Sequence, residues 1–339
     1  MKSPRRPDKA FIVRSPISFW KALRFVVTGG AGFIGSHLVE LLINKGHEVV
    51  VIDNLSTGRP EFLALVKDDP RLRLIIGDLR DPQVALSSIK GTDAVFHLAA
   101  NPEVRLGAQD PTSIYRNNVE VTFNVLEAMR AVGVKVIGFA SSSTVYGDAK
   151  VLPTPEDYPL EPISVYGASK LAGEAMISGY AHTFGWTAVS FRLANVVGRR
   201  QTHGVIYDFI QKLRRNPAEL EVLGDGTQSK SYVHVAEAVE AMYGLLMKAV
   251  ERGVTYEVFN VGGPDRISVL EIASIVASET GLSPRIYTTG GVDGGRGWKG
   301  DVKYMQLDIS KARAWGWSPS MTSREAVRMT VRELLDLKT

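Results

Sequence analysis

Short apolar segments alternate with longer segments of helical periodicity along residues 24–193. Several of the short segments are continuous apolar runs, which is typical of strands that are covered on both faces of a parallel sheet. This alternation predicts an α/β fold built on a doubly wound parallel sheet. The expected strands are Arg24–Thr28, Glu48–Asp53, Leu72–Ile76, Ala94–Leu98, Val134–Ser141 and Thr187–Leu193. The expected helices include Gly32–Lys45, Asp110–Val132 and Ile163–Phe184.

The pattern changes after Asn195, where the elements become shorter and glycine-rich loops appear, most clearly at residues 290–300. We expect residues 23–195 to form a nucleotide-binding domain, and the elements around residues 232–263 to return to it. The remaining segments are expected to form a smaller, substrate-binding C-terminal lobe. They are residues 196–231 and 264–339.

Composition narrows the class of protein. The chain has 339 residues, 45% of them hydrophobic, which is ample for a large core. No apolar run reaches the roughly 18 residues that a membrane helix needs, and Arg14 and Pro16 interrupt the one apolar stretch near the start. The absence of cysteine excludes disulfides, thiolate metal sites and cysteine nucleophiles. We therefore expect a cytoplasmic protein with no membrane partner and no bound metal ion.

The positive charge of the chain is concentrated near its N-terminus. The formal net charge is +4, and residues 1–22 contain six basic residues and one acidic residue, so the rest of the chain is close to neutral. A neutral body lacks the field that attracts nucleic acid, and we expect no nucleic-acid partner. Pro4, Pro7 and Pro16 oppose regular structure in residues 1–22, which we expect to be disordered and dispensable.

Three glycines follow the first expected strand. Gly29, Gly32 and Gly35 stand where that strand gives way to a helix. Glycines in such a turn allow a tight bend, close approach of a pyrophosphate and packing of helix on strand, while the helix N-terminus faces the phosphates. Asp53 ends the next strand, 18 residues after Gly35. Its carboxylate can accept hydrogen bonds from both ribose hydroxyls and would repel a 2′-phosphate. The pattern predicts a Rossmann domain that binds NAD in preference to NADP, although Asp53 could also be a simple turn residue.

Other residues at the ends of the expected strands are candidates for cofactor contacts. Asp78 follows the third strand, where it either caps a loop or contacts the adenine. His97 ends the fourth strand and is expected to be packed in the structure rather than to bind a ligand. Asn117 and Asn118 lie in a helical pattern, where Asn is unfavourable, so one of them is expected to make a specific bond, either structural or catalytic. The other candidates are Phe33, Ile34, Asn54, Leu79, Leu98, Ala99 and Ala100.

A hydroxyl, a phenol and an ammonium group follow the glycine turn in the chain. Tyr166 and Lys170 are four positions apart on an expected helix, so they share one face. A phenol with its ordinary pKa of roughly 10 is a poor base at neutral pH. We expect the ammonium group and a bound nicotinamide ring to lower the pKa of Tyr166 and to stabilise its phenolate. Ser142 ends the fifth strand, where it can bond to a substrate oxygen, and Tyr146 is a rival phenol.

At these motifs the chain resembles the extended short-chain dehydrogenase/reductase family, and most closely its UDP-glucose (UDP-galactose) 4-epimerase members. The resemblance covers about residues 23–335. The family's Thr-Gly-x-x-Gly-x-x-Gly motif begins here at Thr28. Its catalytic Ser/Thr, Tyr and Lys, the Asn of its Arg-x-x-Asn segment and the first Asn of its Asn-Asn-Val helix match Ser142, Tyr166, Lys170, Asn195 and Asn117.

The resemblance implies an enzyme that oxidises a UDP-hexose transiently at C4 and returns the hydride to the opposite face, with NAD as cofactor. The related 4,6-dehydratases carry Asp-Glu after the catalytic Thr, and the nucleotide-sugar decarboxylases carry a Glu there. Ser143 and Thr144 occupy those positions here, which favours epimerisation. Another nucleotide-sugar epimerase or reductase of the family, or a non-catalytic NAD-sensing protein, remains an alternative. We also expect a homodimer.

Two positions depart from the family pattern on the substrate side. Lys230 stands where the family has Arg, so the charge is kept and the bidentate fork is lost. The family's Arg-x-Gly-Asp is stretched here between Arg296 and Asp301, so either Arg296 or Lys299 is expected to contact the pyrophosphate. Asp301 remains a candidate for a substrate contact. Met305 matches the family position that helps to decide whether an N-acetyl group fits.

Overall fold

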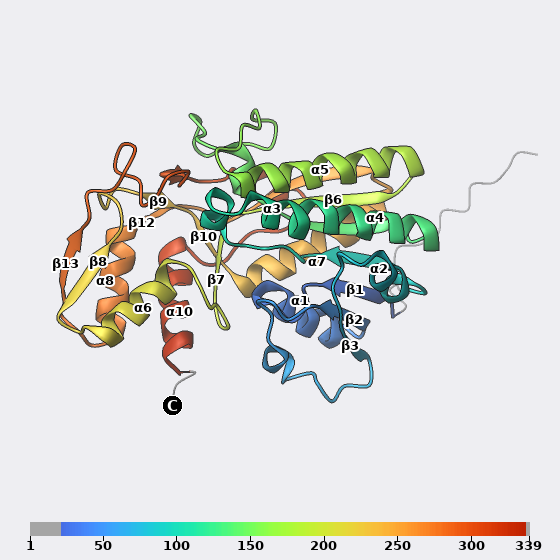
Figure 1. The fold of residues 1–339 in the computed structure, drawn as a ribbon, viewed down its shortest axis with the longest axis horizontal. Coiled ribbons are helices and arrows are strands. Elements are labelled where there is room, and N and C mark those ends of the chain that lie inside the picture. The colour runs from blue at the N-terminus through green and yellow to red at the C-terminus, as the bar shows by residue number, and fades with distance from the viewer. Residues whose placement is uncertain (1–21, 337–339) are drawn as a thin grey trace, which may run out of the picture.

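A computed structural model describes residues 22–336 of the chain, so the expectation for residues 1–22 falls outside the described residues except at Ala22. Its centre is a parallel sheet of seven strands in the order β11-β6-β5-β4-β1-β2-β3 (Figure 1). The neighbouring strands β1 and β4, far apart in the chain, meet at the reversal of strand order. The strands are β1 (Arg24–Thr28), β2 (Glu48–Asp53), β3 (Leu72–Ile76), β4 (Ala94–His97), β5 (Val136–Ser142), β6 (Thr187–Leu193) and β11 (Tyr256–Val261).

Helices cover both faces of this sheet, as the expected doubly wound α/β fold requires. Side chains of α1 and α7 share one hydrophobic core with one sheet face, and side chains of α2, α4 and α5 share a second core with the other face. Figure 1 shows α4 and α5 side by side on their face. The bounds are α1 (Phe33–Asn44), α2 (Pro82–Ile89), α4 (Val121–Val132), α5 (Val165–Phe184) and α7 (Val235–Arg252). The fold class predicted from the sequence is confirmed.

The structure differs in detail from the expected elements. The strand β4 ends at His97 rather than Leu98, and β5 runs from Val136 to Ser142, a shift towards the cavity. The expected continuous helix at residues 110–132 is instead α3 (Pro111–Ile114), a π-helical turn η3 (Tyr115–Glu120) and α4. A π-helical turn inside an α-helix is rare and is often found at functional sites.

The π-helical turn contains the two consecutive asparagines. Asn118 is buried, accepts a hydrogen bond from the backbone of Asn101 at 2.7 Å and donates one to Ser169 Oγ at 2.9 Å. These bonds tie the turn to the loop after β4 and to α5. Asn117 donates to the carbonyl of Ser113 at 2.8 Å and lines the cavity described below. Both asparagines therefore make structural bonds, and Asn117 is the one that also lines the cavity.

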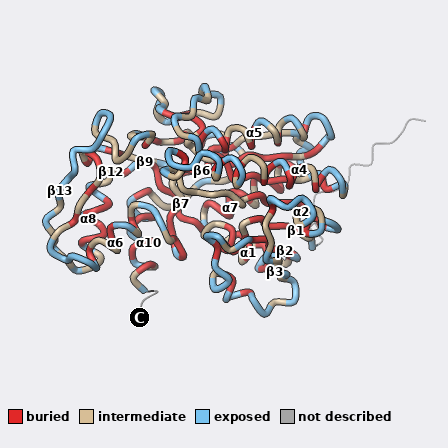
Figure 2. The backbone as a smooth tube through the Cα atoms, viewed as in Figure 1, coloured by how far each residue is buried: buried red, intermediate tan, exposed pale blue. Residues whose placement is uncertain are grey.

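A smaller lobe follows β6 and has a hydrophobic core of its own (Figure 2). Its helices are α6 (Val205–Arg215), α8 (Val269–Glu279) and α10 (Ser323–Asp336), with the short α9 (Ser310–Ala314) beside β11. Its short strands are β8 (Glu219–Val222), β9 (Ser229–Lys230), β12 (Ile267–Ser268), β13 (Arg285–Thr288) and β14 (Tyr304–Met305). The parallel pair β7 (Asn195–Val197) and β10 (Tyr232–His234) links this lobe to the sheet region, and α7 and β11 lie in the sheet region. Within residues 22–336, no helix combines the length and the apolar character needed to cross a membrane.

Candidate active site

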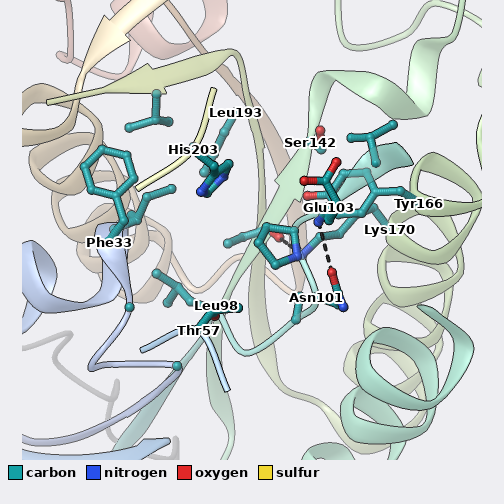
Figure 3. A pocket seen from close by; sticks show the side chains of 18 of the residues that line it. Phe33, Thr57, Leu98, Asn101, Glu103, Ser142, Tyr166, Lys170, Leu193 and His203 are labelled. Carbon is teal, nitrogen blue, oxygen red and sulfur yellow. Dashed lines mark hydrogen bonds between the residues drawn. The ribbon is translucent and has the colours of Figure 1, made fainter. Parts of the chain in front are cut away.

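A cavity of about 970 Å³ opens at the carboxyl ends of the sheet strands (Figure 3). Its walls include Gly29 after β1, Leu98 after β4, Ser142 at the end of β5 and Leu193 at the end of β6. The smaller lobe supplies the facing wall. In open α/β sheets a ligand binds in this crevice, at the point where the strand order reverses. The facing wall contains Gln201, Thr202, His203, Lys230, Tyr232, Trp298, Gly300, Asp301, Val302 and Met305.

The glycine turn after β1 packs closely against neighbouring backbone on its protein side and borders the cavity on its other side. Gly29 has φ of +68°, and a Cβ there would lie 2.9 Å from the backbone nitrogen of Ala99. A Cβ on Gly35 would lie 2.2 Å from the carbonyl oxygen of Gly29, so only glycine lets α1 pack against the turn. Gly32 lines the cavity and caps α1 without a side-chain hydrogen bond. The first N–H groups of α1 are therefore available to an anion such as the pyrophosphate of a dinucleotide.

Asp53, at the end of β2, is held at the cavity wall by the backbone. Its carboxylate accepts hydrogen bonds from the N–H groups of Ala31 at 3.0 Å and Leu55 at 2.8 Å. Burial raises the pKa of Asp53, and these two donors oppose the rise. A Cβ on Gly58 would lie 2.7 Å from Asp53 Oδ1, so the loop after β2 packs closely against the carboxylate. A carboxylate has about four acceptor sites, so Asp53 still has capacity for two ribose hydroxyls.

We expect Asp53→Ala to narrow the preference of the protein for NAD over NADP. The substitution removes the acceptor for the ribose hydroxyls and the negative charge that would repel a 2′-phosphate. Calorimetric titration of both cofactors into the wild-type protein and the variant measures the effect. Equal or tighter binding of NADP by the wild-type protein would overturn the assignment of Asp53.

The other candidate cofactor residues also line the cavity. Asp78 forms a salt bridge with Arg80 at 2.6 Å, which lowers the pKa of Asp78 to about 2, and it also accepts from the Arg80 backbone N–H. Asp78 thus makes the loop-capping bond that was one of its two expected roles, while an adenine contact stays a prediction. The remaining lining residues from the sequence-based set are Phe33, Ile34, Asn54, Leu79, Leu98, Ala99, Ala100 and Asn117.

Ser142, Tyr166 and Lys170 lie together in the cavity wall (Figure 3). The helix α5 starts next to the end of β5, with Ser164 accepting from the N–H of Gly167 at 3.0 Å as its N-cap. Lys170 reaches back from α5 and donates to the carbonyl of Ala140 in β5 at 2.8 Å. Its Nζ lies 5.8 Å from the centre of the Tyr166 ring. The expected group of hydroxyl, phenol and ammonium is therefore assembled by one strand end and one helix.

The pKa values of this group differ from the sequence-based expectation. Burial raises the pKa of Tyr166 to about 12, with an opposing hydrogen bond to Ser142, and burial lowers the pKa of Lys170 to about 8 against the attraction of Glu174. The Tyr166 pKa is therefore not lowered in the protein alone, and the expected lowering by Lys170 and a bound nicotinamide ring together stays a prediction. The reason is that the Lys170 ammonium points at the Ala140 carbonyl and the phenol is desolvated. A positively charged nicotinamide ring beside the phenol would act in the expected direction.

Two other titratable residues singled out from the sequence have structural bonds. Tyr146 is buried outside the cavity wall and bonds to Asn260 at 2.7 Å and Arg192 at 2.9 Å. Lys150 follows Tyr146 at the same spacing as Lys170 follows Tyr166, but the chain is not helical there, so the spacing does not make a shared face. His97 bonds between two threonine hydroxyls, and burial lowers its pKa to about 3. His97 is therefore a buried residue with a structural role, as expected.

The substrate-side candidates divide into two groups. Asn195, Lys230 and Asp301 line the cavity, with Lys230 Nζ 2.6 Å from Asp301 Oδ1 and Asn195 donating to the carbonyl of Ser231 at 3.2 Å. Arg296 instead pairs with Asp148 through both its terminal nitrogens, at 3.0 and 2.7 Å. Neither Arg296 nor Lys299 belongs to the cavity wall, and the expectation that one of them contacts the pyrophosphate stays a prediction.

Sequence reasoning missed several polar residues of the cavity. Glu103 and Arg105 come from the loop after β4, where the residue types after a strand end could have been a signal. Trp298 lies in the glycine-rich stretch at residues 290–300, and His203 lies before α6. The carboxylate of Glu103 opposes the fall in the pKa of His203 that burial causes. Among residues 22–336, no group of three or more His, Asp or Glu side chains is arranged to hold a metal ion.

A Rossmann sheet, a dinucleotide turn and a Tyr–Lys pair in one cavity are typical of short-chain dehydrogenases. Residues 25–262 match the NAD dependent epimerase/dehydratase family. A UDP-glucose 4-epimerase from Corynebacterium glutamicum is 33% identical over 326 residues, which cover 90% of this chain and 93% of the relative. A crystal structure of a UDP-galactose 4-epimerase has a TM-score of 0.84 and 51% identity, covering 94% of this chain and 100% of that one.

Proteins with related reactions have the same fold. A UDP-N-acetylglucosamine 4-epimerase from Methanobrevibacter ruminantium has a TM-score of 0.83 and 29% identity, covering 94% of this chain and 99% of that one. A dTDP-glucose 4,6-dehydratase from Streptomyces venezuelae has a TM-score of 0.81 and 29% identity, covering 93% and 97%. The chain belongs to the NAD-dependent epimerase/dehydratase family, of the extended short-chain dehydrogenase/reductase type, and NAD is its cofactor.

Proposed function

We propose that this protein interconverts UDP-glucose and UDP-galactose by inverting carbon C4. The observation that carries this proposal is that Ser142, Tyr166 and Lys170 lie in the wall of one cavity, which Asn195 and Lys230 also line and where they can meet a nucleotide sugar. The epimerase names among the similar proteins support it. Incubating the purified protein with UDP-galactose and identifying the product by NMR tests it. A non-catalytic NAD-sensing protein would bind NAD and form no UDP-glucose.

The proposed chemistry is a proton transfer coupled to a reversible hydride transfer. The turn at Gly29 and Gly32 and the carboxylate of Asp53 would hold NAD, which would supply a reversible hydride acceptor for C4. Ser142 holds the O4 hydroxyl by a hydrogen bond, and the Tyr166 phenolate takes the O4 proton, which leaves a ketone at C4. Lys170, whose Nζ lies 5.8 Å from the centre of the Tyr166 ring, would stabilise that phenolate together with the positive charge of a bound nicotinamide ring. After the keto sugar has turned over in the cavity, Tyr166 returns the proton to O4.

We expect no 4-keto-6-deoxy product from UDP-glucose or dTDP-glucose. Elimination of water needs an acid and a base, and Ser143 and Thr144, which line the cavity next to Ser142, have only hydroxyl groups. The carboxylate of Glu103 comes from another loop, and its Oε1 accepts from the backbone N–H of Arg105 at 3.2 Å. Mass spectrometry of the reaction mixture checks this expectation. A keto-deoxy sugar formed by homogeneous protein would rule out a simple epimerase.

We expect a higher kcat/KM for UDP-galactose and UDP-glucose than for the N-acetylated sugars. Met305 lines the cavity, is 8% exposed and packs in one cluster with Val145 and Leu307. Methionine is flexible but of intermediate bulk, and in this packed position it limits the space for an N-acetyl group. Steady-state kinetics with UDP-N-acetylglucosamine provide the comparison. Comparable kcat/KM values for both sugar types would show that Met305 does not select against the N-acetyl group.

A homodimer and a cytoplasmic location stay predictions.

A further inference from the structure

Two cations of the cavity wall converge on one indole ring. The guanidinium of Arg105 lies 5.4 Å from the centre of the Trp298 ring, and Nζ of Lys230 lies 5.6 Å from it. All three side chains line the cavity. Arg105 belongs to η2 (Val104–Ala108), which follows β4 of the sheet region, whereas Trp298 and Lys230 belong to the smaller lobe. This contact therefore spans the cavity from one lobe to the other.

Two of these side chains, Trp298 and Arg105, have hydrogen-bonding capacity that the protein itself does not use. Nε1 of Trp298 is buried and has no hydrogen-bond partner, and a buried donor without a partner is costly. Lys230 is paired with Asp301 at 2.6 Å. Arg105 is held only loosely, since its Nε lies 3.4 Å from Glu103 Oε1 and its side chain is 57% exposed. An anion placed here would meet a guanidinium that is free to turn towards it, and it could offer the Trp298 N–H the partner that the N–H lacks.

We propose that Arg105 supplies, together with Lys230 and Trp298 Nε1, the binding site for the diphosphate of the nucleotide sugar, and that Glu103 competes with the diphosphate for Arg105. This inference rests on the proposed function and adds the residues that recognise the nucleotide. It assigns to the loop after β4 a positive charge at the cavity wall, to which Arg296 does not belong. A guanidinium suits a diphosphate, since its planar fork can make two parallel hydrogen bonds to phosphate oxygens.

Calorimetric titration of UDP into the NAD-loaded protein tests the inference, because UDP has the diphosphate and lacks the hexose that Glu103 could otherwise bind. We expect Arg105→Ala to weaken UDP binding by about tenfold or more, the scale of lost hydrogen bonds between charged groups. The UDP affinity of Arg105→Lys should lie between those of Arg105→Ala and the wild type. Trp298→Phe keeps an aromatic ring and removes the N–H, and it should weaken UDP binding by a few-fold. Arg73→Ala, on the exposed edge strand β3, is the control and should bind UDP as the wild type does.

The competition with Glu103 gives a test in the opposite direction. Glu103→Gln should tighten UDP binding, and this gain should disappear when it is combined with Arg105→Ala. Equal UDP affinity of the wild type and Arg105→Ala, both with normal NAD binding, would overturn this inference and leave the proposed function standing. A wild-type protein that neither binds UDP nor converts UDP-galactose would overturn both.

Discussion

Tyr166→Phe is expected to lower the turnover of UDP-galactose by at least roughly 10²-fold, the lower scale for general acid–base catalysis. The substitution removes only the hydroxyl group, and the ring keeps its place over Lys170. The hydroxyl is the group that would exchange a proton with O4, and Ser142 is its neighbour. Because the phenol ring stays, NAD binding should remain close to that of the wild type. Steady-state kinetics at saturating UDP-galactose, with NAD content measured in parallel, check this expectation.

Tyr146→Phe is the matched control for this experiment. Tyr146 is the rival phenol, but it bonds to Asn260 and Arg192 outside the cavity wall. The folded fraction of this variant should turn over substrate at close to the wild-type rate. Near-normal turnover of Tyr166→Phe, or a selective loss in Tyr146→Phe, would show that another group moves the proton.

Arg192→Met is expected to destabilise the fold by about 3–5 kcal/mol, the scale for a buried ion pair that loses one partner. Arg192 in β6 and Glu174 in α5 are 4% and 3% exposed, and two nitrogens of the guanidinium bond to the carboxylate at distances of 2.8 Å and above. The same guanidinium donates to the hydroxyl of Tyr146 and to the carbonyl of Glu156. The variant would leave the Glu174 carboxylate buried with Ser141 as a remaining donor. Urea unfolding followed by circular dichroism measures the loss.

Two further variants separate the burial of a charge from other effects of this substitution. Adding Glu174→Gln to Arg192→Met removes the unpaired charge and should restore part of the stability. Arg24→Met breaks an exposed ion pair, in which Arg24 and Glu48 are 39% and 56% exposed, and should change stability by less than about 1 kcal/mol. An Arg192→Met protein as stable as Arg24→Met would contradict the role given to the buried pair.

Much of the sheet could be predicted closely because several of its strands are continuous apolar runs between helix signals. The strands β1, β2, β3 and β6 have the predicted bounds. The interruption of the helix at residues 115–120 could not be predicted, since it depends on the bonds of Asn118 to the loop after β4 and to α5. Those partners are brought together only by the folded chain.

The cofactor half of the site follows from local motifs, whereas the substrate half depends on contacts between distant segments. The glycine turn and Asp53 are separated by one helix, so their meeting follows from a single β-α-β unit. Arg105 and Trp298 meet from opposite lobes, and no local spacing indicates this contact. The pairing of Arg296 with Asp148 is equally non-local, so the motif could not indicate it. Burial of Tyr166 likewise depends on the whole cavity wall.

The proposed function requires that the same hydrogen leaves C4 and returns to it. UDP-galactose carrying deuterium at C4, incubated with the purified protein in ordinary water, tests this requirement directly. The product predicted here is UDP-glucose that retains the deuterium at C4, as determined by NMR and mass spectrometry. UDP-glucose with hydrogen from water at C4, or no conversion by protein that has bound NAD, would contradict the proposed function.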